Sequence, residues 1–182
     1  MERRVSKRAR KTAKQPAASS VGTAAKRLLA LCRKRELTIA TAESCTGGLV
    51  AGALTEIAGS SDVVDCGFVT YSNAAKQRML GVTALTLERA GAVSREAAEE
   101  MAQGALAHSD ADLAVAITGI AGPGGATPGK PVGLVHFAAA ARGGRSVHRE
   151  KRYGAIGRRK VRLKSVAEAL AMLELIARNN SR

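Results

Sequence analysis

Apolar and polar residues follow two different periods along this chain. Six segments place apolar residues three or four positions apart, the spacing that buries one face of a helix; they are residues 23–35, 49–57, 73–80, 83–90, 94–108 and 158–177. Five shorter segments are continuously apolar or alternate, as strands do; they are residues 37–42, 67–71, 112–118, 134–140 and 146–153. Thr83 and Ser94 stand where N-caps are expected, because their hydroxyls can accept from the first free backbone N–H groups of a helix.

The order of these segments predicts the fold class. Strands separated by helices are typical of an α/β fold, and we expect a three-layer α/β/α sandwich around a mixed, mostly parallel sheet. Aromatic residues make up 2% of the chain and Trp is absent, so we expect a core of Ala, Val, Leu and Ile. Ligands of such sheets bind in the loops beyond the strand ends. Two glycine-rich loops occupy such positions, ESCTGG and TGIAGPGG.

The formal charge of +14 is spread unevenly over 182 residues. Residues 1–20 contain seven Lys or Arg and one Glu, so they are predicted to be a disordered basic tail before a single domain at 21–182. Such a tail can contact nucleic acid or an anionic membrane surface, but without interleaved aromatic residues a solvated extension is the expected role. The basic body favours anionic ligands.

The chain is expected to be cytoplasmic. It has no apolar run long enough to span a membrane and no apolar stretch of a secretory signal after its first charges. Its three cysteines, Cys32, Cys45 and Cys66, fit neither a disulfide framework nor a zinc site. His108, His136 and His148 share no motif and are expected to be packed or surface residues, so no metal is predicted.

The first glycine-rich loop joins a strand to a helix. Gly47 and Gly48 allow the backbone to approach a ligand closely, and the N–H groups there could receive a phosphate. Glu43, Ser44 and Thr46 complete this candidate binding set. The alternative is a tight turn in which Glu43 or Thr46 caps the helix, and the residues alone leave both open.

The second loop follows the buried strand 112–118. Thr118, Gly119, Gly122 and Lys130 are its candidate binding residues, and Lys130 is its only charge. A flexible surface loop is the alternative. Arg158 and Arg162 lie four residues apart on one face of the last helix, where they could clamp an anion or form a solvated face.

Ser61, Tyr71 and Lys76 are the candidate catalytic residues. A serine becomes a nucleophile when a base takes its proton, and a desolvated lysine can be that base. A straight strand would separate Ser61 from Tyr71 by roughly 33 Å, so the chain must bend near Gly67 or a neighbouring subunit must supply one member.

Several runs of the chain resemble the C-terminal domain family of the competence/damage-inducible protein CinA. These runs are TIATAESCTGGLVAGALTEIAGSS, GFVTYSNAAKQRMLGV, GAVSREAAEEMAQGAL and AITGIAGPGG with KPVG, and together they cover roughly residues 22–177. The resemblance implies hydrolysis of the carboxamide of nicotinamide mononucleotide to nicotinic acid mononucleotide and ammonia. It implies Ser61 as nucleophile, with Tyr71 and Lys76, and a nucleotide pocket lined by both glycine-rich loops, with Lys130 or the late arginines near the phosphate.

These considerations give one favoured function and two alternatives. The favoured one is a cofactor-free nicotinamide-nucleotide amidohydrolase, expected to be a homo-oligomer. The first alternative is a non-catalytic nucleotide or nucleic-acid binding module that uses the basic tail. The second is an amidase with the same chemistry that acts on a related pyridine amide.

Overall fold

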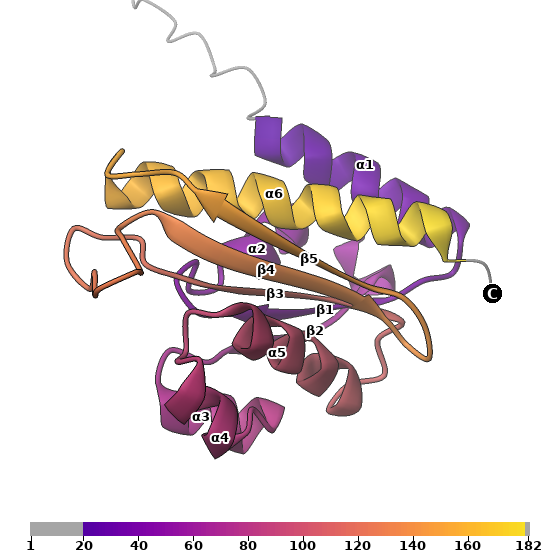
Figure 1. The fold of residues 1–182 in the computed structure, drawn as a ribbon. Helices are drawn as coiled ribbons and strands as arrows, with labels where there is room; N and C mark the ends of the chain where they lie inside the picture. The colour runs from indigo at the N-terminus through magenta and orange to yellow at the C-terminus, as the bar shows by residue number, and fades with distance from the viewer. Residues whose placement is uncertain (1–19, 181–182) are drawn as a thin grey trace, which may run out of the picture.

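A five-stranded sheet with strand order β2-β1-β3-β4-β5 organises the molecule. The computed structural model describes residues 20–180, and Figure 1 shows their arrangement. The strands are β1 (Ile39–Glu43), β2 (Val64–Val69), β3 (Leu113–Gly119), β4 (Leu134–Ala141) and β5 (Ser146–Arg152). The α-helices are α1 (Ser20–Lys34), α2 (Leu49–Thr55), α3 (Asn73–Leu80), α4 (Ala84–Arg89), α5 (Arg95–Ala107) and α6 (Arg158–Asn179), and a short 3₁₀ turn, η1 (Ser60–Asp62), precedes β2.

The sheet is mixed, as expected, but it is not mostly parallel. β1 is parallel to both β2 and β3, whereas β3–β4 and β4–β5 are antiparallel pairs. A parallel pair needs a crossover, usually a helix, and the glycine- and proline-rich residues 120–133 form none. A short turn joins β4 to β5, which permits only an antiparallel hairpin.

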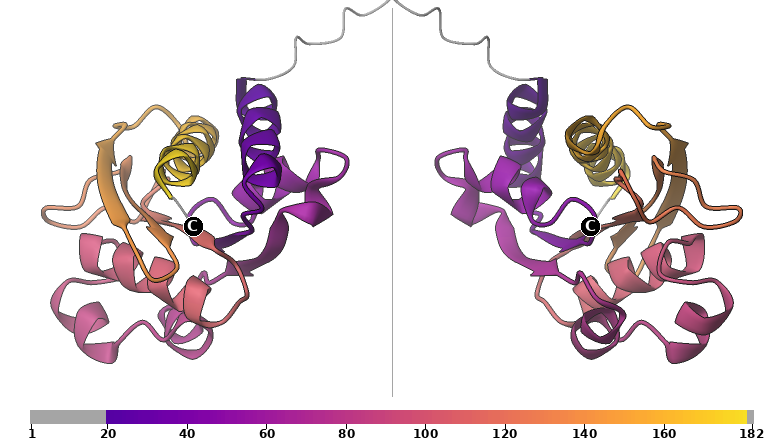
Figure 2. Two further views of the ribbon diagram at one scale, coloured as in Figure 1. Left: turned by 90° about the vertical axis from the view of Figure 1, so that its right-hand side faces the viewer. Right: turned by 90° about the vertical axis from the view of Figure 1, so that its left-hand side faces the viewer.

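Helices cover both faces of the sheet. Helices α1 and α6 lie above it and α3 to α5 lie below it in Figure 1, and the end-on views of Figure 2 show the same layers. Because successive strand residues point to opposite faces, β3 presents Val115 and Ile117 to the α6 side and Ala114 and Ala116 to the α5 side. Alanines let α5 approach closely, and this explains how a core with few aromatic residues stays packed.

The predicted helix starts are confirmed. The Ser94 hydroxyl accepts from the Ala97 N–H of α5, and the Thr83 hydroxyl accepts from the Thr86 N–H of α4. The predicted edge strand is also confirmed, because β5 ends the sheet. Residues 1–19 of the predicted tail lie outside the described part of the chain, and Ser20 begins α1.

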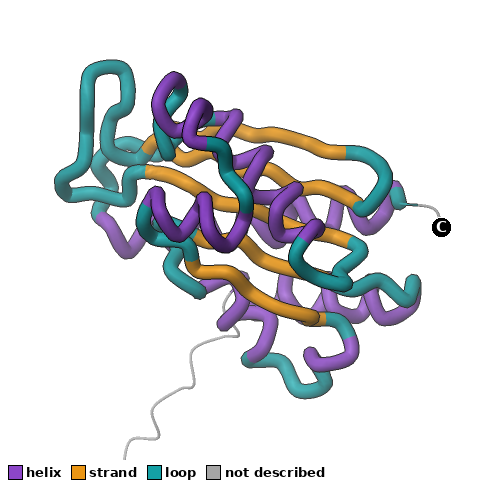
Figure 3. Tube along the Cα trace, turned by 90° about the horizontal axis from the view of Figure 1, so that it is seen from below, coloured by secondary structure: helices purple, strands orange, loops and turns teal. Residues whose placement is uncertain are grey.

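The strand directions gather one set of loops at one edge of the sheet. The carboxyl ends of β1, β2 and β3 lie together there, because these strands are parallel neighbours. Seen from below, helices of the lower layer lie in front of the strands (Figure 3). No helix within residues 20–180 is long and apolar enough to cross a membrane.

Candidate functional site

Ser44 stands at the first position of the turn that leaves β1. Its backbone N–H donates to the Ile117 carbonyl at 3.0 Å, and its own carbonyl accepts from the Gly47 N–H at 3.0 Å. Gly47 and Gly48 have φ of 60° and 92°, values that residues other than glycine rarely adopt. The two glycines therefore let the chain turn sharply from strand to helix directly after Ser44.

Glu43 fixes this turn from inside the molecule. Its buried carboxylate accepts from the N–H groups of Gly48, Val50 and Ala51 at 2.9–3.0 Å. Those are the free donors of the first turn of α2, so Glu43 occupies the place where an anion was expected. The helix-capping alternative is the one the geometry supports for Glu43.

Lys76 meets Ser44 from α3. Ser72 caps this helix by accepting from the Ala75 N–H, and Lys76 is only 1% exposed. The Lys76 Nζ donates to Ser44 Oγ at 3.1 Å and to the Thr70 carbonyl at 2.7 Å. Among residues 20–180 no carboxylate forms an ion pair with it. Burial therefore lowers the pKa of the Lys76 ammonium, and this favours the neutral amine that a general base must be.

Ser61 lies at the other end of the sheet. It belongs to η1, immediately before β2, whereas Tyr71 follows the carboxyl end of that strand. The six residues of β2 alone span roughly 20 Å. Gly67 does not bend the chain, because it sits inside β2 and is paired with Thr41. Within one chain the structure thus brings Lys76 and Ser44 together, and it does not bring Ser61 to either Lys76 or Tyr71.

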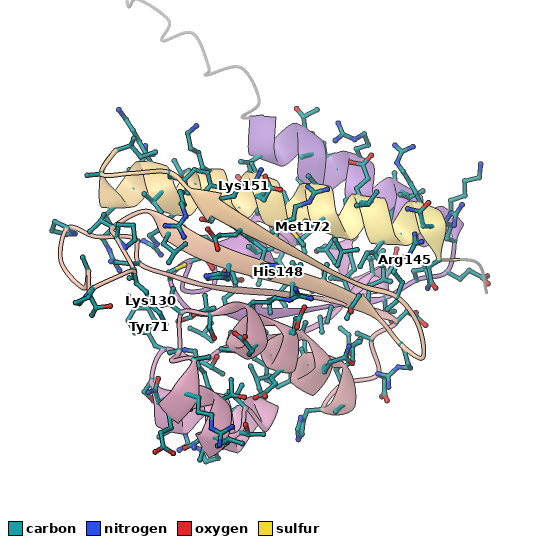
Figure 4. The ribbon with its side chains drawn as sticks, in the orientation of Figure 1. Tyr71, Lys130, Arg145, His148, Lys151 and Met172 are labelled. Atoms are coloured by element: carbon teal, nitrogen blue, oxygen red, sulfur yellow. The ribbon has the colours of Figure 1, made fainter. Side chains whose placement is uncertain are left out.

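Tyr71 stands at the surface of the same edge as Ser44. The residue is 61% exposed, and its Oη accepts from Arg158 Nη2 at 2.8 Å. The Arg158 Nη1 donates to the Gly122 carbonyl at 3.1 Å. Arg158 therefore joins the loop after β2 to the loop after β3. Figure 4 shows Tyr71 and Lys130 at this end of the molecule and Arg145 at the opposite end.

Arg162 contacts the Ser44 turn from outside. Its Nε donates to the Cys45 carbonyl at 3.1 Å and its Nη2 to the Thr46 carbonyl at 2.6 Å. This contact is possible because α6 packs beside α2. The two arginines predicted to share a helix face thus both reach the site, on different partners.

The remaining predicted residues hold loops together. Thr118 is buried and its hydroxyl donates to the Ala92 carbonyl at 2.6 Å. The Lys130 ammonium donates to the Ala90 carbonyl. Gly119 closely approaches β4, because a Cβ there would lie 2.8 Å from the Leu134 carbonyl oxygen.

Two buried hydroxyls beside the site have no hydrogen-bond partner within residues 20–180. The Oγ1 atoms of Thr46 and Thr70 are inaccessible and make no hydrogen bond to the described residues, and the same is true of Thr41 Oγ1 inside β1. Burying a hydroxyl without a hydrogen bond costs free energy, and proteins rarely accept this cost without a reason. Thr46 and Thr70 both flank the Ser44–Lys76 contact, Thr70 through its carbonyl.

A hollow of about 450 Å³ opens beside the Ser44 turn. It is lined by three arginines and two leucines: Leu49, Arg158, Arg159, Arg162 and Leu163. Its volume falls within the range of small-molecule pockets. A larger hollow of about 570 Å³ lies over α1, α2 and α6. Neither hollow is lined by Ser44, Tyr71 or Lys76, but the smaller one is lined by Arg158, which contacts Tyr71, and by Arg162, which contacts the Ser44 turn.

The other reactive side chains form no second centre. Within the described residues no group of three or more His, Cys, Asp or Glu could hold a metal ion. Burial raises the pKa of the Cys45 thiol to about 12. His136 Nδ1 and His148 Nε2 lie 3.1 Å apart, and burial lowers the pKa of both imidazoles.

Ser44 is among the binding residues predicted from the sequence. The structure places it on a strand–turn–helix junction with glycines after it, an arrangement that exposes a nucleophilic hydroxyl in many hydrolases. That signal was readable from ESCTGG. The contact with Lys76 was not, because it joins residues that are 32 positions apart.

Comparison with known proteins identifies the family. Residues 22–176 match the CinA C-terminal domain model. The chain is 50% identical over 132 residues to a protein named nicotinamide-nucleotide amidohydrolase PncC from Enterobacter agglomerans, a match that covers 72% of this chain and 80% of that one. It is 57% identical over 135 residues to a CinA-like protein from Mycolicibacterium vanbaalenii, a match that covers 74% of this chain.

The chain spans only about a third of the length of that CinA-like protein, 32%. Among solved structures, the competence/damage inducible protein CihA from Agrobacterium tumefaciens superposes with a TM-score of 0.85 and 56% identity, over 93% of this chain and 100% of that one. Family match, sequence identity and fold agree, and the chain belongs to the CinA C-terminal domain family.

Proposed function

We propose that this protein hydrolyses the carboxamide of nicotinamide mononucleotide, giving nicotinic acid mononucleotide and ammonia, with Ser44 as nucleophile and Lys76 as base. The single observation that carries the mechanism is the contact of 3.1 Å between Lys76 Nζ and Ser44 Oγ. A relative with 50% identity is named a nicotinamide-nucleotide amidohydrolase, and this supports the choice of substrate.

The reaction begins with proton transfer. Neutral Lys76 takes the proton of the Ser44 hydroxyl as Oγ attacks the carboxamide carbon. A tetrahedral intermediate forms, and Lys76 returns the proton to the amide nitrogen so that ammonia leaves. The acyl-enzyme on Ser44 is then attacked by a water that Lys76 deprotonates, which releases the carboxylic acid and restores Ser44. No cofactor is required by this sequence of steps.

The oxyanion of the intermediate needs hydrogen-bond donors. The Cys45 N–H follows Ser44 directly and donates to no backbone carbonyl among the described residues. In hydrolases with a nucleophile on such a turn, the N–H after the nucleophile is one of the oxyanion donors. We assign the Cys45 N–H this role.

The substrate is held by the outer part of the site. Arg158 is exposed and supplies positive charge to the hollow beside the Ser44 turn, so we assign the phosphate of the nucleotide to it. Tyr71 is held by Arg158, and we assign its exposed ring to the nicotinamide end. All of these groups belong to one chain, so this mechanism needs no residue from a neighbouring subunit. We place the activity in the cytoplasm.

The test is turnover of nicotinamide mononucleotide by the purified protein, with ammonia and the acid product both quantified. Two serine variants, Ser44→Ala and Ser61→Ala, are compared with the wild type. We expect Ser44→Ala to lose at least about 10³-fold in kcat, the scale of a lost nucleophile, and Ser61→Ala to stay near the wild-type rate. Absence of wild-type turnover would sink the function. Full activity of Ser44→Ala would sink the mechanism.

A further inference from the structure

We propose that Arg162 is a positioning residue that holds the nucleophile turn in its reactive shape, and not a ligand of the substrate phosphate. The proposal rests on the proposed function, because it assigns Ser44 as the nucleophile. It concerns a side chain for which the sequence leaves open two roles, an anion clamp and part of a solvated helix face.

The Arg162 guanidinium bridges two consecutive carbonyls. Nε binds the Cys45 oxygen at 3.1 Å and Nη2 binds the Thr46 oxygen at 2.6 Å. A planar guanidinium holds two acceptors in a fixed relation, which a lysine ammonium cannot do. The two carbonyls belong to the two peptides that follow the Ser44–Cys45 peptide, so the contact fixes the middle of the turn.

Peptide geometry transmits this contact to the opposite side of the turn. The peptide bonds on either side of Thr46 are trans. In each of them the N–H therefore points in the direction opposite to the carbonyl of the same peptide group. With the Cys45 carbonyl turned toward Arg162, the N–H of the same peptide, that of Thr46, points to the other side. The Thr46–Gly47 peptide is oriented likewise, and its N–H donates to the Ser44 carbonyl. Arg162 thereby supports the hydrogen bond that closes the turn at Ser44.

Gly47 is shaped to receive the guanidinium. A Cβ at Gly47 would lie 3.3 Å from Arg162 Nη2, and the residue has φ of 60°. On the inner side the Glu43 carboxylate holds the N–H groups that follow the turn. The turn is thus clamped from two sides, by an anion under the N–H groups and by a cation over the carbonyls.

This role predicts a kinetic signature different from that of a phosphate ligand. Loss of a phosphate ligand raises KM for the nucleotide and leaves a substrate without phosphate unaffected. Loss of turn geometry lowers kcat for both, because misplacing a reacting group by about 1 Å costs about 100-fold. Nicotinamide mononucleotide and nicotinamide riboside are the two substrates to compare.

The experiment measures both substrates with Arg162→Ala, Arg162→Lys and the control Lys160→Ala, which removes an exposed charge of the same helix that lines neither hollow. We expect kcat of Arg162→Ala to fall about 100-fold on both substrates, with KM within about threefold. Added guanidinium should restore at least a tenth of the lost rate, and ammonium should not. Arg162→Lys should stay impaired. A KM effect confined to the phosphorylated substrate, or no effect, would overturn the proposal.

A readout without turnover separates this proposal from the proposed function. Hydrogen exchange of the peptide that covers residues 44–51 should be about tenfold faster or more in Arg162→Ala, with no change in Lys160→Ala. If the wild type hydrolyses no nicotinamide mononucleotide, the proposed function is wrong. The exchange result still tests whether Arg162 holds the turn at Ser44. Unchanged exchange would contradict the proposed role of Arg162.

Should Arg162→Ala not fold, Gly47→Ala takes its place and Gly143→Ala is the control. The two glycines have similar φ values, 60° and 68°, and only Gly47 faces Arg162. Gly47→Ala should then reproduce the loss of kcat, and equal activity of the two glycine variants would count against the clamp.

Discussion

The two ends of the sheet differ in whether their polar side chains have ion-pair or hydrogen-bond partners. At the Ser61 end, Arg33 pairs with Asp62 at 3.2 Å and donates to the Gly59 carbonyl, and Asp112 accepts from the N–H and hydroxyl of Thr38. At the Ser44 end, Lys76 is buried and no carboxylate of the described residues pairs with it. The Thr70 hydroxyl makes no hydrogen bond within the same residues. Within the described residues, the Ser44 end therefore holds a buried amine without a counter-charge and two of the three buried hydroxyls that make no hydrogen bond.

This difference supports the proposal that the reaction takes place at the Ser44 end. Paired and capped groups at the Ser61 end stabilise the fold. An amine buried without a counter-charge destabilises it, because desolvation disfavours the ammonium. The same desolvation produces the neutral base that an amidohydrolase with a serine nucleophile requires. The comparison thus predicts that variants at the Ser44 end lose activity without losing stability, and that variants at the Ser61 end do the reverse.

The largest expected effect is that of Lys76→Met. Removal of the base should lower kcat about 10³-fold, and the unfolding midpoint should rise because a buried amine without a counter-charge is replaced by an apolar side chain. Turnover and thermal unfolding at pH 7 check both parts. Lys34→Met, an exposed lysine at the far end of α1, is the control and should change neither. A Lys76→Met protein that is less stable than the wild type would contradict the statement that the buried Lys76 amine destabilises the fold.

The pH dependence sharpens the assignment to Lys76. With its pKa lowered in the folded state, the unfolded chain binds this proton more tightly, so its contribution to stability rises with pH between the lowered pKa and the ordinary value of 10.5. The stability advantage of Lys76→Met should be greatest below that window and should shrink through it. In the wild type, kcat/KM should rise up to about tenfold per pH unit below the lowered pKa and then level off. Urea unfolding and initial rates over the same pH series measure the two, and a constant stability gap would argue against a lowered pKa.

At the Ser61 end, Asp112→Ala should reduce stability without affecting the chemistry. It leaves the Thr38 N–H without its acceptor at 2.9 Å, at a cost of about 2 kcal/mol. For a chain of this size the midpoint should fall by roughly 4–8 °C, with kcat per folded molecule unchanged. Asp112→Asn, which keeps an acceptor, should recover most of the loss. A fall in kcat as large as that of a catalytic variant would show that the Ser61 end also affects catalysis, and this would contradict the comparison.

The smallest effects come from a matched pair of threonines. Thr70→Val removes a hydroxyl without a hydrogen bond and should be neutral or stabilising by up to about 1 kcal/mol. Thr38→Val removes a hydroxyl that donates to Asp112 at 3.0 Å and should destabilise by about 1 kcal/mol. Chemical unfolding of both variants measures the difference. Equal destabilisation would mean that the Thr70 hydroxyl has a partner in solution.

Much of the fold could be predicted from sequence because its signals are local. The caps at Ser94 and Thr83 and the continuous apolar run of β3 depend on neighbouring residues only. The proportion of parallel pairs was predicted wrongly, because it depends on what residues 120–133 do in space. Alternation of apolar residues does not report strand direction.

The site was predictable in its parts but not in its pairing. The sequence pointed to Lys76, Tyr71 and the glycine turn, and the structure gathers all three at one edge. It also pointed to Ser61, which shares residue type with Ser44 but lies across the sheet. The choice between two serines depends on which of them a buried amine reaches, and that distance exists only in the folded chain.

The most direct test of this account is to find which serine reacts. Incubation with a fluorophosphonate, which phosphonylates activated serines, followed by peptide mass mapping identifies the modified residue. The account predicts one adduct, on Ser44, that forms at least about 10²-fold more slowly in Lys76→Met. An adduct on Ser61, or labelling of Ser44 at the same rate without Lys76, would contradict it.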